Sequence, residues 1–323
     1  MKDAARCVLA GALLAFTSVG CSNSGDCLMS FREQTGRIEV LADGKPVATY
    51  RYTDPQIPRP YFAHLRTLGG IQVTRNHPPV AGVDPTDHEE LHPGIWMAFG
   101  DLSGSDFWRN KARVVHEAFE RRPTGGRGRG SFAVRNRYLA GGTDGGTVCR
   151  ETARYTIAVR PCGYLLLWDS TFTSDKELWF GDQEEMGLGI RVASPITVRS
   201  GGTMLDAHGR RNEAQIWGQP ADWCDYSGAI DGRRVGMTVM CAPDNFRPSR
   251  YHARDYGFVA ANPFGRQCFK AGDESRVVVK PRESLRLRYG MLIHDSPERD
   301  TLDLASDLAR EFKLFCTLLE QIR

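Results

Sequence analysis

Residues 284–293 read SLRLRYGMLI, and apolar side chains occupy every second position of this stretch. The alternate positions are Leu285, Leu287, Tyr289, Met291 and Ile293. Successive side chains of a β-strand point to opposite faces, so this period of two predicts a strand with one face on a core and one face in water. Residues 150–159, RETARYTIAV, repeat the pattern. Alternation of apolar and polar residues with the two-residue period of a β-strand is therefore the dominant pattern in the chain.

Further strands are expected on either side of these two. In residues 37–52, RIEVLADGKPVATYRY, Asp43-Gly44 separates two apolar runs, which is the signal of a β-hairpin. Other short apolar stretches are separated by Gly, Pro and Asp, and they lie at 94–99, 112–119, 131–139, 164–173, 188–193, 223–230, 234–240 and 256–260. This arrangement predicts an all-β fold, a large antiparallel β-sandwich of the jelly-roll or supersandwich kind.

One helix is expected, over residues 297–322. Ser296 is a suitable N-cap and Pro297 suits the first turn. Its apolar stripe consists of Leu304, Leu308, Phe312, Phe315, Leu319 and Ile322. The stripe predicts packing against a sheet, with a partner surface as the alternative. There is no internal repeat and no linker after residue 30, so residues 35–323 are expected to form one domain.

The N-terminus has the features of an export signal. Lys2 and Arg6 precede a short apolar run, which ends at small residues before Cys21. We expect a signal peptide over 1–20, lipidation at Cys21 and a tether over 21–34, with simple secretion as the alternative. The protein would then be lipid-anchored in a bacterial cell envelope, periplasmic or at the outer membrane, or secreted. No later stretch has the apolar length of a membrane helix.

Charge and cysteine usage narrow the functional classes. The formal net charge is +3, and the one dense basic run, RRPTGGRGRG at 121–130, is expected to be a solvated loop, so no nucleic-acid partner is expected. Nine cysteines include Cys7 and Cys21, and none of the remaining seven are spaced as CxxC. If disulfides form, Cys149 with Cys162 and Cys224 with Cys241 are the plausible pairs.

Residues 88–92, HEELH, match the H-E-x-x-H signature of zinc proteases. That motif needs a sustained helix, but Pro-rich sequence precedes it and Pro93-Gly94 follows. We expect a loop or single turn that brings His88 and His92 to the edge of a sheet. Loops over a rigid sheet commonly carry binding and catalytic groups, although solvent-exposed loop polarity explains the same residues.

Other clusters combine tryptophan with charged side chains, and each follows or precedes an expected strand. They contribute Asp106, Trp108, Glu185, Arg191, Trp217, Asp225, His252, Arg254, Asp255 and Asn262. Aromatic faces and charged hydrogen-bonding groups together are typical of saccharide sites. Taken singly, each cluster also fits a buried tryptophan or a surface ion pair.

Five segments that carry these residues resemble a bacterial family of unknown function labelled "methane oxygenase PmoA-like". They are RPYFAHLRTLGGIQVTRNHPP, TDHEELHPGIWMAFGDLSGSDFW, FGDQEEMGLGIRVA, WGQPADWCDYSGAIDGRRVGMTV and NFRPSRYHARDYGFVAANPFG. The resemblance covers about residues 35–295 and implies a commonly secreted β-sandwich found in polysaccharide-degrading bacteria. The matching positions include His88, His92, Gly94, Trp96, Asp106, Phe107, Trp108, Glu185, Gly187, Gly189, Arg191, Trp217, Asp225, Tyr226, His252, Arg254, Asp255, Asn262 and Phe264. Many relatives have D-H-P-H-H-R-G where this chain has DHEELHPG.

We expect a carbohydrate-active enzyme, a lyase or hydrolase acting on a glycan or oxidised glycoside. His88, His92 or His252 would act as acid or base, Glu185 as the complementary carboxylate, and Arg191 or Arg254 would stabilise an anion. Asp106, Trp108, Trp217, Asp225, Asp255 and Asn262 would bind substrate. A divalent metal on His88, His92 and His252 is an open alternative to the arginine role.

Two other functions remain open. The first is a non-catalytic, lipid-anchored glycan-binding or scaffold protein in which Trp96, Trp108, Trp217 and Trp223 form a stacking platform. The second is a metal-dependent oxidoreductase, suggested by the family label and the histidine pair.

Overall fold

The stretch 284–293 forms most of strand β19 (Ser284–Pro297), inside an eight-stranded antiparallel sheet. In spatial order this sheet contains β13 (Thr203–Asp206), β14 (Trp223–Ile230), β15 (Arg233–Cys241), β19, β10 (Gly163–Thr173), β9 (Thr147–Arg160), β8 (Arg129–Leu139) and β6 (Arg113–Thr124). Leu285, Leu287, Tyr289, Met291 and Ile293 all lie in the main core, as the alternation predicts. These observations come from a computed structural model that describes residues 26–141, 145–297 and 304–322.

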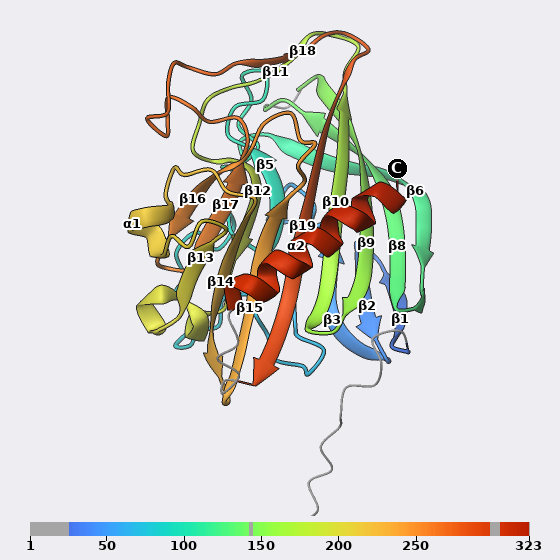
Figure 1. The fold of residues 1–323 in the computed structure, drawn as a ribbon. Helices are drawn as coiled ribbons and strands as arrows, with labels where there is room; N and C mark the ends of the chain where they lie inside the picture. Colours follow the sequence, from blue (N-terminus) through green and yellow to red (C-terminus); the bar gives the residue numbers. More distant parts are fainter. Residues whose placement is uncertain (1–25, 142–144, 298–303, 323) are drawn as a thin grey trace, which may run out of the picture.

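A nine-stranded antiparallel sheet packs on the other side of this core. Its order is β16 (Arg250–Arg254), β17 (Phe258–Asn262), β12 (Met186–Arg191), β5 (Ile95–Phe99), β4 (Tyr61–Ala63), β3 (Lys45–Arg51), β2 (Arg37–Ala42), β1 (Leu28–Gln34) and β7 (Gly126–Arg127). A third, two-stranded sheet pairs β11 (Leu178–Phe180) with β18 (Val277–Val279). The predicted large antiparallel β-sandwich is thus confirmed (Figure 1).

The predicted hairpin lies between β2 and β3. Asp43 and Gly44 have φ values of 47° and 76°, and positive φ at both central residues is what a tight type I′ hairpin turn requires. The basic run 121–130 was expected to be a loop and is instead largely strand, because β6 continues to Thr124 and β8 begins at Arg129. Its arginines therefore lie along a long hairpin.

Helix α2 (Leu304–Gln321) lies across the outer surface of the eight-stranded sheet (Figure 1). Leu308, Phe315 and Leu319 pack there against a second apolar cluster that includes Leu292 of β19. Residues 287–294 in the middle of β19 are consequently buried on both faces, whereas the sequence predicted one wet face. Ser296 and Pro297 end β19 and do not cap the helix. Short helices complete the structure: η1 (Ser194–Ile196), η2 (Val198–Ser200) and α1 (Asn212–Ile216).

All seven cysteines within the described residues are free thiols, so neither expected disulfide is formed. Cys149 lies near the start of β9 and Cys162 follows its end, which separates the two along a 14-residue strand. Cys224 pairs in register with Val239, so Cys241 is its diagonal and not its direct neighbour.

The expected signal peptide and the lipidation residue Cys21 lie outside the described residues. Within the described part of the chain, no helix is both long and apolar enough to cross a membrane.

Candidate functional site

Most of the predicted site residues lie on the outer face of the nine-stranded sheet, the face turned away from the main core. Along β5, β12, β16 and β17 the alternate residues in the main core include Met97, Leu188, Tyr251 and Val259. Their sequence neighbours therefore face outward. The outward set includes Trp96, Gly187, Gly189, Arg191, Arg250, His252, Arg254, Phe258 and Asn262. Four strands from distant parts of the sequence thus present one continuous polar and aromatic surface.

Small residues in the middle of this face make room for two large rings. The strand register places His252, Ala260, Gly189 and Trp96 in one row across β16, β17, β12 and β5. A Cβ atom on Gly189 would lie 2.6 Å from Cζ2 of Trp96 and 3.1 Å from Cη2 of Trp108. Both indole rings therefore rest against this glycine, which no larger residue can replace without moving them.

Five rings form what we call the aromatic cluster: His92, Trp96, Trp108, Tyr256 and Phe258. Phe258 is at its centre, with ring centroids 4.7 Å from His92, 6.1 Å from both tryptophans and 6.3 Å from Tyr256. The His88 ring stacks on His92 at 4.9 Å, and the His252 ring approaches Phe258 edge-on at 5.1 Å. All three predicted histidines therefore border one cluster.

The HEELH sequence is a turn and not a helix, as expected. His88 has a φ of 51°, and the amide of His92 donates to the carbonyl of His88 at 2.9 Å. His92 is buried, and burial, followed by the charge of Arg191, lowers its pKa well below the ordinary value. His88 is about half exposed and lies 3.1 Å from the carboxylate of Asp87.

Two buried arginines anchor the site loop, residues 85–92. Arg75 donates to the carbonyl oxygens of Pro85, Asp87, His88 and His92 at 2.6–3.3 Å. Arg59 donates to the carbonyl of Leu91 at 2.6 Å and to that of Trp108 at 3.1 Å. The two guanidinium groups hold the backbone of the loop and of the Trp108 segment in place.

Arg191 connects the site loop to the aromatic cluster. Its Nη2 donates to Oδ1 of Asp87 at 2.9 Å, and its guanidinium lies 4.5 Å from the Tyr256 ring. Burial raises the pKa of Asp87, but hydrogen bonds from His88 and Arg191 outweigh this effect, and the pKa lies below its ordinary value. Arg191 is 1% exposed, so it positions Asp87 and Tyr256 from below the surface.

A second polar group lies at β16. Nε2 of His252 is 3.4 Å from Oε2 of Glu184, and that carboxylate is also 3.5 Å from Nη2 of Arg254. Burial, and then the charge of Arg254, lowers the pKa of His252 to about 3, so the imidazole is neutral at pH 7. The side-chain amide of Asn262 donates to the carbonyls of Gln183 and Glu184 and fixes this segment.

Glu185, the carboxylate predicted from the sequence, is paired elsewhere. It forms an ion pair with Arg109, which also contacts Asp106 at 3.2 Å. The neighbouring Glu184 is the residue that approaches His252. The two glutamates are adjacent in the sequence, and nothing in the sequence distinguishes the directions of their side chains.

Several buried ring nitrogens around Phe258 have no hydrogen-bond partner among the described residues. They are Nε1 of Trp96, Nε1 of Trp108, Nδ1 of His92 and Nδ1 of His252. Buried polar atoms in folded proteins are almost always satisfied by protein, water or ligand. Their concentration around one aromatic ring therefore marks a place that additional polar atoms are expected to occupy.

A hollow of about 340 Å³ opens beside the aromatic cluster, at Tyr256 and the site loop. Its lining consists of Pro85, Asp87, His88, Ser194, Thr197, Arg199, Ser200 and Tyr256. Hydroxyl, carboxylate, imidazole and guanidinium groups thus surround one aromatic ring. The half-exposed His88 lies at this hollow and not in the closed part of the cluster.

Three predicted substrate-binding residues are not on this surface or are occupied by other contacts. Asp225 is fully buried in the eight-stranded sheet, where His294 lies 2.8 Å away. Asp255 and Glu213 bond each other's backbone amides at the start of α1. Trp217 packs edge-on against Phe269 at 5.5 Å, beside β16.

The expected tryptophan platform is not formed. Trp96 and Trp108 are fully buried, and Trp223 lies under helix α2 on the opposite side of the molecule. The structure likewise does not assemble His88, His92 and His252 as a ligand set: within the described residues, no three His, Cys, Asp or Glu side chains are grouped to hold a metal ion. His252 is separated from the stacked His88 and His92 by Phe258.

Residues 37–307 match the model of a family described as "Family of unknown function (DUF6807)", and the chain belongs to this family. That description contains no reference to an oxygenase, so the methane-oxygenase label has no support here. No protein with a curated description matches the sequence.

Several solved structures are distantly similar. A putative kojibiose phosphorylase from the human microbiome has a TM-score of 0.40 and 8% identity, covering 84% of this chain and 32% of its own. The α-galactosidase AgaA from Geobacillus stearothermophilus has 0.41 and 9%, covering 83% and 41%. A GalM/aldose epimerase homologue from C. elegans has 0.32 and 11%, covering 83% and 99%. This chain thus spans about a third to two fifths of the first two, and likenesses this weak do not identify its function.

Proposed function

We propose that the outer face of the nine-stranded sheet binds and cleaves a saccharide, as a lyase or hydrolase acting on a glycan or oxidised glycoside. One observation carries the proposal: unpartnered ring nitrogens surround Phe258 beside the His252, Glu184 and Arg254 group. Saccharides offer many hydroxyl groups and apolar ring faces, and the adjoining hollow provides hydrogen-bonding groups and the Tyr256 ring for both.

The residues have complementary roles in elimination chemistry. A base removes a proton next to a carbonyl or carboxylate, and a cation stabilises the enolate that results. The enolate then expels the leaving oxygen, which is protonated by the protonated base or by its neighbour. We assign proton acceptance to the neutral imidazole of His252 or to the adjacent Glu184, and enolate stabilisation to Arg254. An anionic substrate bound beside the imidazole would raise the pKa of His252, which burial and the charge of Arg254 otherwise lower to about 3.

In this proposal Arg191 acts indirectly. It holds Asp87 and Tyr256 at the hollow, where Asp87, His88 and the serine and threonine hydroxyls would bind a neighbouring sugar unit. Glu185 and Asp106 orient Arg109 along the same edge. These are positioning roles, and they replace the direct roles that the sequence suggested for Arg191 and Glu185.

A non-catalytic glycan-binding function is the second candidate. It is favoured by the ion pairs of the site, because Asp87, Glu184 and Glu185 each lie against an arginine. Incubation of the protein with a panel of glycans and 3-keto-glycosides distinguishes the two candidates. The enzyme is supported if new reducing ends or unsaturated products appear, are lost in His252→Ala, and are retained in the control His208→Ala, a variant at an exposed histidine. Saturable binding without any product after long incubation supports the binding protein.

We also propose export and lipidation at Cys21, on the basis of the N-terminal sequence alone. The anchor would place the saccharide site at the cell envelope. Metabolic labelling with radioactive palmitate should label the wild-type protein and not Cys21→Ala. An unlabelled wild-type protein in the culture medium would indicate simple secretion.

A further inference from the structure

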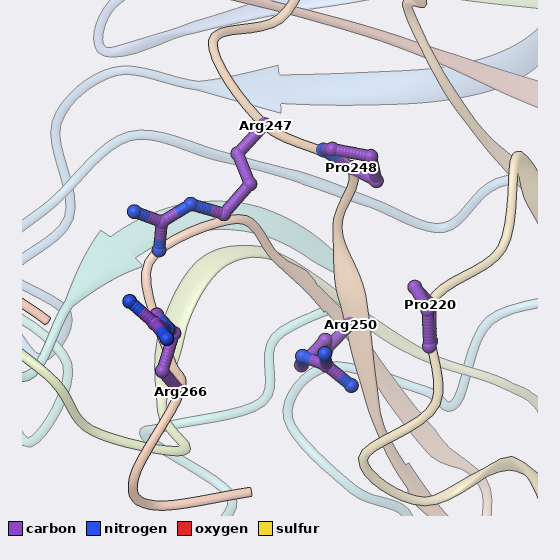
Figure 2. A pocket seen from close by; sticks show the side chains of 5 residues that line it. All are labelled: Pro220, Arg247, Pro248, Arg250 and Arg266. Atoms are coloured by element: carbon purple, nitrogen blue, oxygen red, sulfur yellow. The ribbon is translucent and has the colours of Figure 1, made fainter. Parts of the chain in front are cut away.

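Three arginines surround a separate pocket of about 230 Å³ at the end of β16. Its lining consists of Pro220, Arg247, Pro248, Arg250 and Arg266. Figure 2 shows the guanidinium groups of Arg247 and Arg266 on one side, and Arg250 with Pro220 on the other. The pocket volume is several times the ~30 Å³ that one water molecule occupies in the liquid, so it has room for a group larger than water.

The charges of these arginines are not neutralised by carboxylates. Among the ion pairs of the described residues, none includes Arg247, Arg250 or Arg266. Arg247 donates to the Ser275 hydroxyl at 3.0 Å, and Arg250 donates to the Gly218 carbonyl at 2.8 Å. Neutral acceptors thus fix these two side chains and leave their positive charges in place.

The carboxylate of Asp182 lies near the pocket but is already engaged. It accepts hydrogen bonds from the backbone amides of Arg266, Gln267, Cys268 and Ser275 at 2.7–3.2 Å. Burial, and then the charge of Arg266, lowers the pKa of Arg247; Asp182 partly offsets this effect, and Arg250 adds to it. Three arginines beside one carboxylate leave an excess of positive charge, which favours an anionic ligand.

We propose that this pocket binds a tetrahedral oxyanion, a sulfate or phosphate group carried by a saccharide. The three guanidinium groups come from two segments, residues 247–250 and the loop at Arg266, and each offers several N–H donors. A sulfate or phosphate group presents three or more oxygens in different directions and can accept from all three at once, whereas a carboxylate has two oxygens in one plane.

The pocket adjoins the candidate saccharide site. Arg250 and His252 alternate along β16, so both side chains point to the outer face about 7 Å apart along the strand. Phe269 links the two regions, because its ring contacts those of His252 and Trp217 at 6.5 Å and 5.5 Å. That the oxyanion belongs to a saccharide rests on the proposed function, whereas oxyanion binding itself rests on the arginines alone.

Isothermal titration of the protein with sodium sulfate and sodium phosphate, at ionic strength matched with sodium chloride, tests the pocket directly. Arg266 is the residue to replace, because no side-chain hydrogen bond or ion pair is seen for it within the described chain. We expect sulfate and phosphate to bind, and Arg266→Ala to bind them at least about tenfold more weakly. Arg211→Ala, an exposed arginine outside the pocket, is the matched control for charge and should bind as the wild type does.

Each other outcome overturns a defined part of the inference. A specific oxyanion pocket is refuted if the heat of titration is the same for sulfate, phosphate and chloride. It is also refuted if Arg211→Ala loses as much affinity for sulfate and phosphate as Arg266→Ala does. Acetate bound as tightly as sulfate refutes the tetrahedral assignment. Titration with glucose 6-sulfate and glucose 6-phosphate then identifies the source of the oxyanion. Sulfate or phosphate binding without a gain in affinity for either sugar leaves the pocket intact and refutes its link to the saccharide site.

Discussion

Nε2 of His252 lies 3.4 Å from Oε2 of Glu184, although the two residues come from separate strands and loops of the nine-stranded sheet. The imidazole is buried and neutral, and the carboxylate is about one-third exposed. The pair combines a hydrogen-bonding ring with an accessible acid–base group. Replacement of either residue should therefore affect the chemistry more than the fold.

Glu184→Gln keeps the shape of the side chain and removes its charge. If Glu184 takes part in proton transfer, turnover of a responsive glycan should fall by about 10²- to 10⁴-fold, with a smaller change in KM. The matched control is Glu177→Gln, at an exposed glutamate outside the site. Equal turnover by Glu184→Gln and wild type would remove Glu184 from the mechanism.

Gly189→Ala tests the contact between the two indole rings and β12. The added Cβ would lie 2.6 Å from the Trp96 ring, and overpacking of this kind costs about 1–3 kcal/mol. We expect a lower thermal midpoint together with weaker saccharide binding. Gly146→Ala is the control, because a Cβ there meets no atom within 4 Å. Unchanged midpoints for both variants would show that the rings move without cost.

Arg75→Ala should loosen the site loop. It removes the hydrogen bonds to four carbonyl oxygens, and bonds from a charged donor contribute about 1.5–3 kcal/mol each. Hydrogen exchange of the amides of residues 85–92 should accelerate, and Arg75→Lys should not restore it, because an ammonium cannot reach four carbonyls as the guanidinium does. Arg122→Ala, at an exposed arginine, should leave the exchange unchanged.

The buried histidines predict a fall in stability on mild acidification. Burial lowers the pKa of His252 to about 3 and that of His77 to about 4, and it keeps the pKa of His92 well below the ordinary 6.5. Below pH 6.5 the unfolded chain therefore binds protons that the folded chain does not. The free energy of unfolding should decrease from pH 6.5 towards the folded values, by up to about 1.4 kcal/mol per pH unit for each histidine.

Urea unfolding at pH 7.5 and pH 5.0 measures this effect. His252→Asn cannot titrate and should lose less stability between the two conditions than the wild type. His208→Ala should lose as much as the wild type, since this side chain is exposed. The same loss in all three proteins would mean that His252 does not contribute.

Much of the fold follows from local pattern. Alternation identifies the inward residues of β9 and β19, and Asp43-Gly44 identifies the first hairpin. The pattern fails where distant segments meet. The outward side of β19 is buried because α2 packs on it, and the sequence of residues 284–293 gives no signal of that packing. The extent of the hairpin between β6 and β8 was missed because glycine and arginine are poor local signals for strands.

The candidate site was predicted in composition but not in geometry. His92, His252, Arg191 and Arg254 lie at one surface, because alternation puts them on outward positions or on a loop beside them. Which residues touch depends on the strand order β16, β17, β12, β5, a non-local property. The sequence therefore could not choose Glu184 over Glu185, and it could not place Asp225 on the other sheet.

Arg59 and Arg75 hold the site loop by donating hydrogen bonds to its main-chain carbonyl oxygens. Every amino acid has a main-chain carbonyl oxygen. These hydrogen bonds therefore depend on the path of the backbone and not on which side chains the loop carries. During evolution, histidine, acidic or proline residues within positions 85–92 can be substituted while the loop keeps its position. The buried guanidinium groups thus make this loop a place where specificity can diverge without refolding.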